Sequence, residues 1–142
     1  MKKNKMINKT FRIPVDLAQH MDELGIPPND IVIQALRQFF GLPLEESIVF
    51  MQQIHAWVVE QFSGQDFDED VTLKTFRHIK EDNNLFNAYQ RIVKMQEENT
   101  LHRRIGKMVK VALKAEVIGR SLQLDPAKEL IKTYALLRRS TK

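Results

Sequence analysis

Three hydrogen-bonding side chains near the start of the chain, Asn8, Thr10 and Arg12, occupy alternate positions. An amide, a hydroxyl and a guanidinium are groups that donate to or accept from the edges of DNA bases. The positions between and after them hold Lys9, Phe11 and Ile13. A period of two places the two sets on opposite faces of a β-strand. The pattern therefore predicts a strand over residues 9–13 with a polar face suited to contacting bases.

This strand requires a partner, because no second strand pattern follows it in the sequence. A lone strand leaves its backbone N–H and C=O groups without hydrogen bonds. The same strand of a second copy can supply them, and the DNA major groove admits a two-stranded ribbon of this kind. We therefore expect a homodimer that binds double-stranded DNA, with Asn8, Thr10 and Arg12 contacting bases.

Two helical patterns come directly after the strand. Leu17, Met21 and Leu24 have the spacing of one helix face, and Gly25 is suited to end that helix. A second helix is expected to begin at the Pro27–Pro28 pair and to stop at Gly41. Its residues are apolar nearly all round, which predicts burial in a dimer. The expected dimer core consists of Phe11, Ile13, Leu36 and Phe39.

A strand, a helix, a glycine-containing turn and an apolar helix in about forty residues closely resemble the ribbon-helix-helix family, the superfamily of the Arc and MetJ repressors. The resemblance covers residues 7–41, less than a third of the chain. It implies that the outward strand residues read bases and that the first turn of the second helix holds a DNA phosphate through backbone N–H groups. This chain departs from the family pattern there, because Pro27 and Pro28 lack an N–H group and Asp30 adds negative charge.

The remaining phosphate contacts are expected from Asn29 and from a basic N-terminal arm. The first fourteen residues contain no acidic side chain and five basic ones, of which Lys2, Lys3, Lys5 and Lys9 are assigned to phosphates. The arm is not followed by a continuous apolar segment, so a secretion signal is not expected. No segment approaches the roughly 20 apolar residues of a membrane span. These observations favour a bacterial cytoplasmic protein that does not bind membranes.

Charge is unevenly distributed along the chain, whose net charge is +4. Residues 42–100 carry five basic and eleven acidic side chains, whereas residues 101–142 carry eleven basic and three acidic ones. Helical spacing predicts helices over 44–62, 71–81, 84–98 and 101–121, and a last helix that begins after Asp125. The fourth of these helices has an apolar stripe and a basic face that consists of Arg103, Arg104, Lys107, Lys110 and Lys114.

This basic face has three possible roles that the sequence leaves open. It is a second nucleic-acid surface, a docking site for an acidic protein partner, or an ordinary solvated face. Pairing with the acidic stretch 45–82 of a neighbouring dimer would make binding to tandem DNA sites cooperative, and would produce an oligomer larger than a dimer.

The sequence contains no recognisable catalytic pattern. The chain has no cysteine, and its five glycines form neither a phosphate-binding loop nor a dinucleotide fingerprint. Its four histidines appear isolated, without a carboxylate at ligand spacing. Asp66, Asp68 and Asp70 resemble the start of a calcium loop, but Val71 and Arg77 replace the glycine and glutamate that such a loop requires. We expect no enzyme activity, no metal site and no cofactor.

The sequence thus predicts a mostly α-helical protein in two parts. Residues 1–41 form a ribbon-helix-helix domain for DNA binding and dimerisation, and residues 42–142 form an all-α domain for oligomerisation or partner binding. The expected function is that of a sequence-specific transcription regulator, encoded on a plasmid, phage or integrative element according to the resemblance. The alternatives are a relaxosome accessory protein at an origin of transfer, an antitoxin, and a helical adaptor that does not bind DNA.

Overall fold

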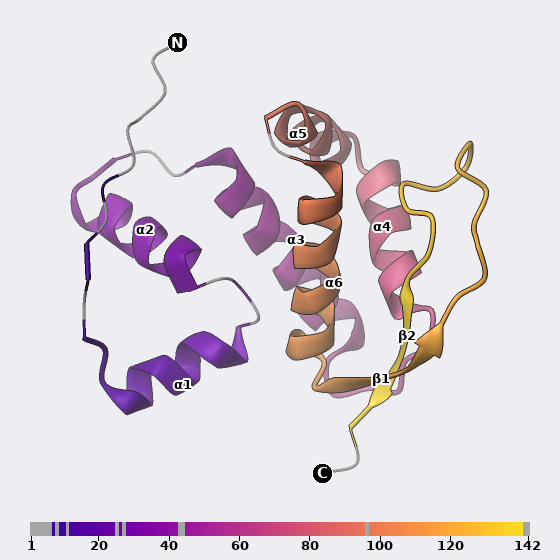
Figure 1. The fold of residues 1–142 in the computed structure, drawn as a ribbon, viewed down its shortest axis with the longest axis horizontal. Coiled ribbons are helices and arrows are strands. Elements are labelled where there is room, and N and C mark those ends of the chain that lie inside the picture. Colours follow the sequence, from indigo (N-terminus) through magenta and orange to yellow (C-terminus); the bar gives the residue numbers. More distant parts are fainter. Residues whose placement is uncertain are drawn as a thin grey trace.

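The computed structural model describes residues 7, 9–10, 12–24, 26, 28–42, 45–95 and 97–140 of the 142-residue chain. These residues form six helices and one two-stranded antiparallel sheet (Figure 1). In chain order the elements are α1 (Val15–Glu23), α2 (Pro28–Phe39), α3 (Glu46–Phe62), α4 (Val71–Glu81), α5 (Asn83–Val93), α6 (Glu98–Ala112), β1 (Ala115–Arg120) and β2 (Ala135–Arg139).

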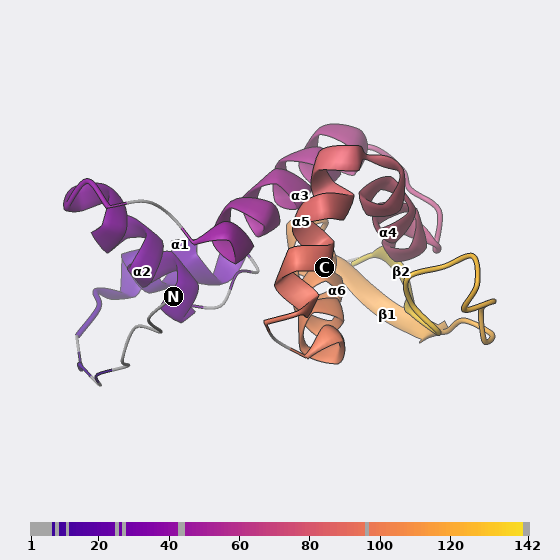
Figure 2. The same ribbon diagram turned by 90° about the horizontal axis from the view of Figure 1, so that it is seen from above.

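Helices α1 and α2 lie beside each other on one side of the molecule, apart from the cluster that α4, α5, α6 and the sheet form around α3 (Figure 1, Figure 2). Both helices begin and end within a few residues of the positions that the sequence predicts. The predicted turn between them contains Gly25 and Pro27, which lie outside the described residues. We call residues 7–42 the N-terminal half and residues 45–140 the C-terminal half.

The described residues of the segment 9–13 form no strand in this single chain. A strand is defined by hydrogen bonds to a neighbour, and the expected neighbour belongs to a second copy. Asn8 and Phe11, which were assigned to its two faces, lie outside the described residues, as do Lys2, Lys3 and Lys5. The strand therefore stays a prediction that depends on dimerisation.

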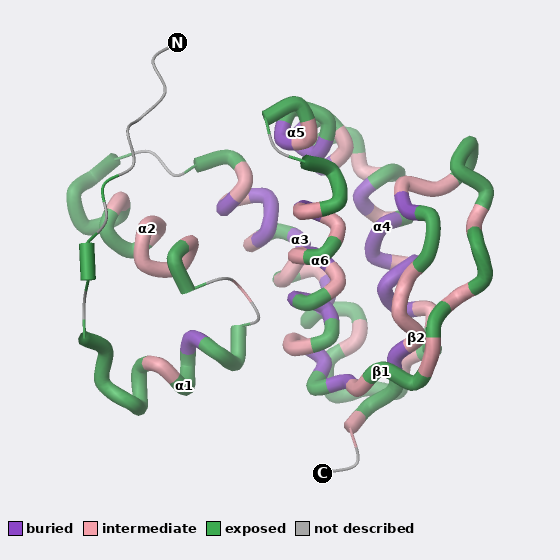
Figure 3. The backbone as a smooth tube through the Cα atoms, in the orientation of Figure 1, coloured by how far each residue is buried: buried purple, intermediate pink, exposed green. Residues whose placement is uncertain are grey.

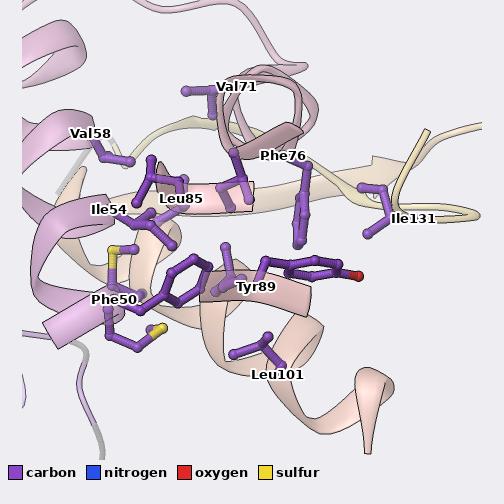
Figure 4. Close-up of a cluster of buried hydrophobic side chains, with 14 of the residues drawn as sticks. Phe50, Ile54, Val58, Val71, Phe76, Leu85, Tyr89, Leu101 and Ile131 are labelled. Atoms are coloured by element: carbon purple, nitrogen blue, oxygen red, sulfur yellow. The ribbon is translucent and has the colours of Figure 1, made fainter. Parts of the chain in front are cut away.

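The core of the protein belongs to the C-terminal half (Figure 4). Helix α3 lies between the other elements, and its Phe50, Ile54 and Val58 are at most 1% exposed. Trp57 covers a further side of α3, because its ring stacks on His78 of α4 with centroids 4.1 Å apart. Two sides of this helix therefore pack against other elements of the same chain.

The expectation of an all-α C-terminal domain is wrong. The apolar stripe Leu101, Ile105, Met108 continues α6 only as far as Ala112, and Lys114 then adopts a positive φ of 51°, a left-handed conformation that ends the helical path. Residues 115–120 form β1 instead of the last turns of a longer helix. The left-handed residue, rather than any change in apolar spacing, marks the end of the helix.

The predicted last helix is wrong as well. Asp125 begins only a short turn, in which the N–H groups of Lys128 and Glu129 donate to its carbonyl. Leu137 is buried from β2, not from a helix face, and pairs with Val117 of β1. Arg138 lies on β2, and its Nε donates to Glu116 Oε1 across the sheet at 2.7 Å. Pairing between distant strands thus overrides a spacing that is compatible with a helix.

Candidate nucleic-acid interface

The segment before α1 holds the residues that were expected to contact DNA. Lys9, Thr10 and Arg12 are exposed, and Pro14 separates them from the first turn of α1. The segment runs along the outer edge of the N-terminal half, on the side away from α3 to α6 (Figure 1). The C-terminal half therefore leaves this edge accessible to a large partner.

Most described residues of the N-terminal half are exposed (Figure 3), and they include large apolar side chains. Among its described residues only Met21 is buried. Of the expected dimer core, Ile13 is 39% exposed, Leu36 44% and Phe39 81%, while Phe11 lies outside the described residues. Further large apolar side chains are exposed in the same half, namely Ile7, Val15, Leu17, Leu24, Phe40 and Leu42. Where such side chains form a contiguous patch, they mark an interaction surface in soluble proteins.

The first turn of α2, where the family pattern places a DNA phosphate, has an additional neighbour. Pro28 is the first helical residue and Asn29 is exposed beside it. Asp30 is half-buried, and its Oδ2 lies 3.5 Å from Arg104 Nη1 of α6. The guanidinium offsets the negative charge that would otherwise repel a phosphate at this helix end. The pairing links the two halves through residues far apart in the sequence.

The basic face expected on the helix after residue 101 is divided in the structure. Arg104 points to Asp30, and Lys114 lies in the turn after α6. Arg103, Lys107 and Lys110 form a separate row at i, i+4 and i+7, which lines a groove beside α6. The five residues therefore do not act as one surface.

One histidine is not isolated, contrary to the expectation from the sequence. His102 Nε2 lies 2.8 Å from the hydroxyl of Tyr89 and 3.7 Å from Glu98 Oε1, one helical turn earlier. Burial is the main cause that raises the pKa of Tyr89 and lowers that of His102. A neutral imidazole bonded to a protonated phenol connects α5 to α6. The i, i+4 spacing of Glu98 and His102 was the signal that could have revealed this cluster.

His102 is expected to make the stability of the protein depend on pH. Because burial lowers its pKa in the folded state below 6.5, the unfolded chain binds the proton more readily. The free energy of unfolding should therefore fall as the pH drops below about 6.5, with an upper limit of about 1.4 kcal/mol per pH unit for this group. Urea denaturation between pH 7.5 and 5.5, at roughly half-unit steps, measures this effect.

The variant His102→Gln should reduce this pH dependence while it keeps a polar partner for Tyr89. His20→Gln is the matched control, because the side chain of His20 is 79% exposed. Equal pH dependence in the wild type and in His102→Gln would show that this imidazole does not titrate on unfolding.

Comparison with known proteins provides no family for this chain. No protein-family model matches the sequence, and no significant match exists among the curated proteins or the solved structures. Among the described residues, no helix combines the length and the apolar character needed to cross a membrane. No group of three metal-ligating side chains occurs among them either. The function must therefore be argued from the geometry itself.

Proposed function

We propose that this chain is a ribbon-helix-helix protein that binds double-stranded DNA as a homodimer and regulates transcription sequence-specifically. The exposed apolar surface of the N-terminal half, next to the exposed Thr10 and Arg12, is the observation that carries the proposal. Both features have a common explanation if two copies pair through residues 7–42. The proposal includes no catalytic activity.

Dimerisation is supported by the contrast between the two halves. The C-terminal half buries twenty large and small apolar side chains in one cluster, whereas the N-terminal half buries Met21 alone among its described residues. Helix α2 has no buried residue, although Ile31, Val32 and Ile33 follow one another in it. A second α2 packed against the first would remove these side chains and Phe39 from water, which is favourable by about 25 cal/mol per Å² of apolar area.

DNA binding is supported by the side chains that dimerisation would leave outside. If residues 9–13 of two copies form a ribbon, Ile13 turns toward the helices, and Thr10 and Arg12 turn away from them. Arg12 would donate to a guanine edge and Lys9 and Asn29 to phosphates. Asn8, Lys2, Lys3 and Lys5, which lie outside the described residues, complete the proposed interface.

Two of the alternatives, an antitoxin and a helical adaptor, explain fewer features of the described residues. The C-terminal half has its own core, whereas an antitoxin tail of the kind expected is short and disordered before it meets the toxin. A purely structural adaptor would have no use for a polar ribbon face. A relaxosome accessory protein stays compatible with every feature, since it differs only in where its DNA sites lie. We also propose that the protein acts in the bacterial cytoplasm and that a mobile genetic element encodes it.

Footprinting of the purified protein on fragmented DNA from its own genome tests the proposal. We expect discrete protected sites in promoter regions, with inverted half-sites that reflect the dimer's two-fold axis. Protection confined to an origin of transfer would favour the relaxosome role. Uniform, sequence-independent protection, or none at low salt, would contradict sequence-specific DNA binding.

A further inference from the structure

A long groove lies in the C-terminal half, between α5, α6 and the connection from β1 to β2. Its volume is about 1450 Å³, which exceeds the roughly 300–1,000 Å³ of a site for a small molecule. Phe76 and Tyr89 lie beside each other in the lining, and Ile131 of the connection lies across from them (Figure 4). The groove is distant in the fold from the ribbon segment and does not belong to the proposed DNA interface.

The lining of the groove combines apolar side chains with polar ones, and its edge on α6 is positively charged. Arg103, Lys107 and Lys110 are exposed, and within the described part of the chain they form no hydrogen bond or ion pair. Five other basic residues in the described part of this half are paired with carboxylates, among them Arg77 with Glu129 at 2.9 Å and Arg91 with Glu46 at 2.6 Å. The row on α6 is therefore available to an outside partner.

Three acidic residues, Glu97, Glu98 and Glu129, also line the groove. Glu129 is held by Arg77, and Glu98 lies beside His102 and the hydroxyl of Tyr89. Glu97 is exposed at the start of α6. Five basic side chains, Arg103, Lys107, Lys110, Arg120 and Lys132, outnumber the three carboxylates in the lining, so the groove favours a ligand with negative charges.

We propose that this groove binds an acidic amphipathic segment of a protein partner. Apolar side chains of the segment would enter the groove, and its carboxylates would meet the row on α6. The row spans about 10 Å along the helix axis, a distance that also separates acidic residues two turns apart in a partner helix. The proposal goes beyond DNA binding by the N-terminal half and does not depend on it.

The burial of the aromatic rings argues for a peptide over single-stranded nucleic acid. Bases stack on ring faces that are open to solvent. Phe76 is only 2% exposed and Tyr89 5%, and the ring of Tyr89 already lies parallel to that of His102. These rings therefore offer no open face on which a base could stack.

Gly106 permits a direct test, since it lines the groove within the basic row. A Cβ added at this position would have no neighbouring atom within 4 Å. Gly106→Trp should therefore fill the groove without displacing the core, whereas Gly106→Ala leaves it open and favours the helix. Lys107→Glu reverses one charge of the row, and Lys114→Glu makes the same change in the turn outside the groove.

The probe is a fluorescein-labelled acidic peptide of about 18 residues, five helical turns, with leucines on one face and glutamates on the other. A scrambled peptide of the same composition has no apolar face. By fluorescence anisotropy with the full-length protein, we expect the amphipathic peptide to bind more tightly than the scrambled one. Gly106→Trp and Lys107→Glu should each weaken binding by about tenfold or more, and Gly106→Ala and Lys114→Glu by less than about twofold.

Three results would overturn the proposal. The first is no saturable binding of the amphipathic peptide, or equal binding of both peptides. The second is a labelled oligothymidylate that binds with the same sensitivity to Gly106→Trp and Lys107→Glu while the peptide does not. The third is a wild-type oligomer larger than a dimer that Lys107→Glu dissociates in sedimentation experiments, which would identify a second copy as the occupant. DNA footprinting with the Lys107→Glu variant measures DNA binding by the N-terminal half separately from peptide binding by the groove.

Discussion

The variant Phe39→Asp should convert the protein from a dimer into a monomer. Phe39 is 81% exposed in the single chain, so its replacement removes little packing within one copy. In the proposed dimer the same ring is buried, where truncation of a phenylalanine costs about 3–5 kcal/mol and a buried unpaired carboxylate costs more. The dimer dissociation constant should therefore rise by at least about 100-fold. Specific DNA binding should be lost with it, because the ribbon requires two strands.

Light scattering after size-exclusion chromatography at micromolar concentration measures this change. Leu122→Asp is the matched control, because Leu122 is 89% exposed in the connection between β1 and β2, outside the N-terminal half. The control should stay dimeric and should bind DNA normally. A wild-type protein that is already a folded monomer, or a Phe39→Asp variant that remains dimeric, would refute the proposed interface.

The variant Arg12→Ala should lose sequence discrimination rather than all affinity. A guanidinium donates two hydrogen bonds to one guanine, and each good pair of this kind contributes about 1–3 kcal/mol of discrimination against a wrong base. We expect the ratio of specific to non-specific affinity to fall by roughly 5- to 150-fold per contact, with preference relaxed at one base pair of each half-site. Titration of a selected site and of a randomised duplex at the same salt concentration gives both affinities.

Two further substitutions separate the recognition of bases from the nonspecific attraction between a positive charge and DNA. Arg12→Lys keeps the positive charge but cannot form the bidentate pair, so it should reduce discrimination while it preserves the salt dependence. Lys9→Ala should weaken binding to all DNA sequences alike, and it should reduce the slope of log affinity against log salt concentration by about one. If Arg12→Ala leaves the ratio of affinities unchanged, the segment before α1 does not read DNA sequence.

Apolar periodicity in the sequence was sufficient to place the first five helices. Their spacing depends on local geometry, so α1 (Val15–Glu23) and α4 (Val71–Glu81) begin and end close to the predicted positions. The same reasoning predicted the exposed polar side chains before α1 and an apolar α2. The sequence also predicted a strand before α1. A single chain cannot form that strand, because its proposed partner strand belongs to a second copy.

Only the tertiary structure decided the conformation after residue 112. The residues of β1 and β2 have a spacing that is also compatible with helices, and their strand form depends on hydrogen bonds between segments separated by a long connection. Tertiary packing also brought Arg104 to Asp30, and it joined α5, α6 and the β1–β2 connection into the groove. The sequence alone determined the local helical periods and the distribution of charge. The fold determined the sheet, the division of the basic residues and the groove, because each requires contacts between residues that are distant along the chain.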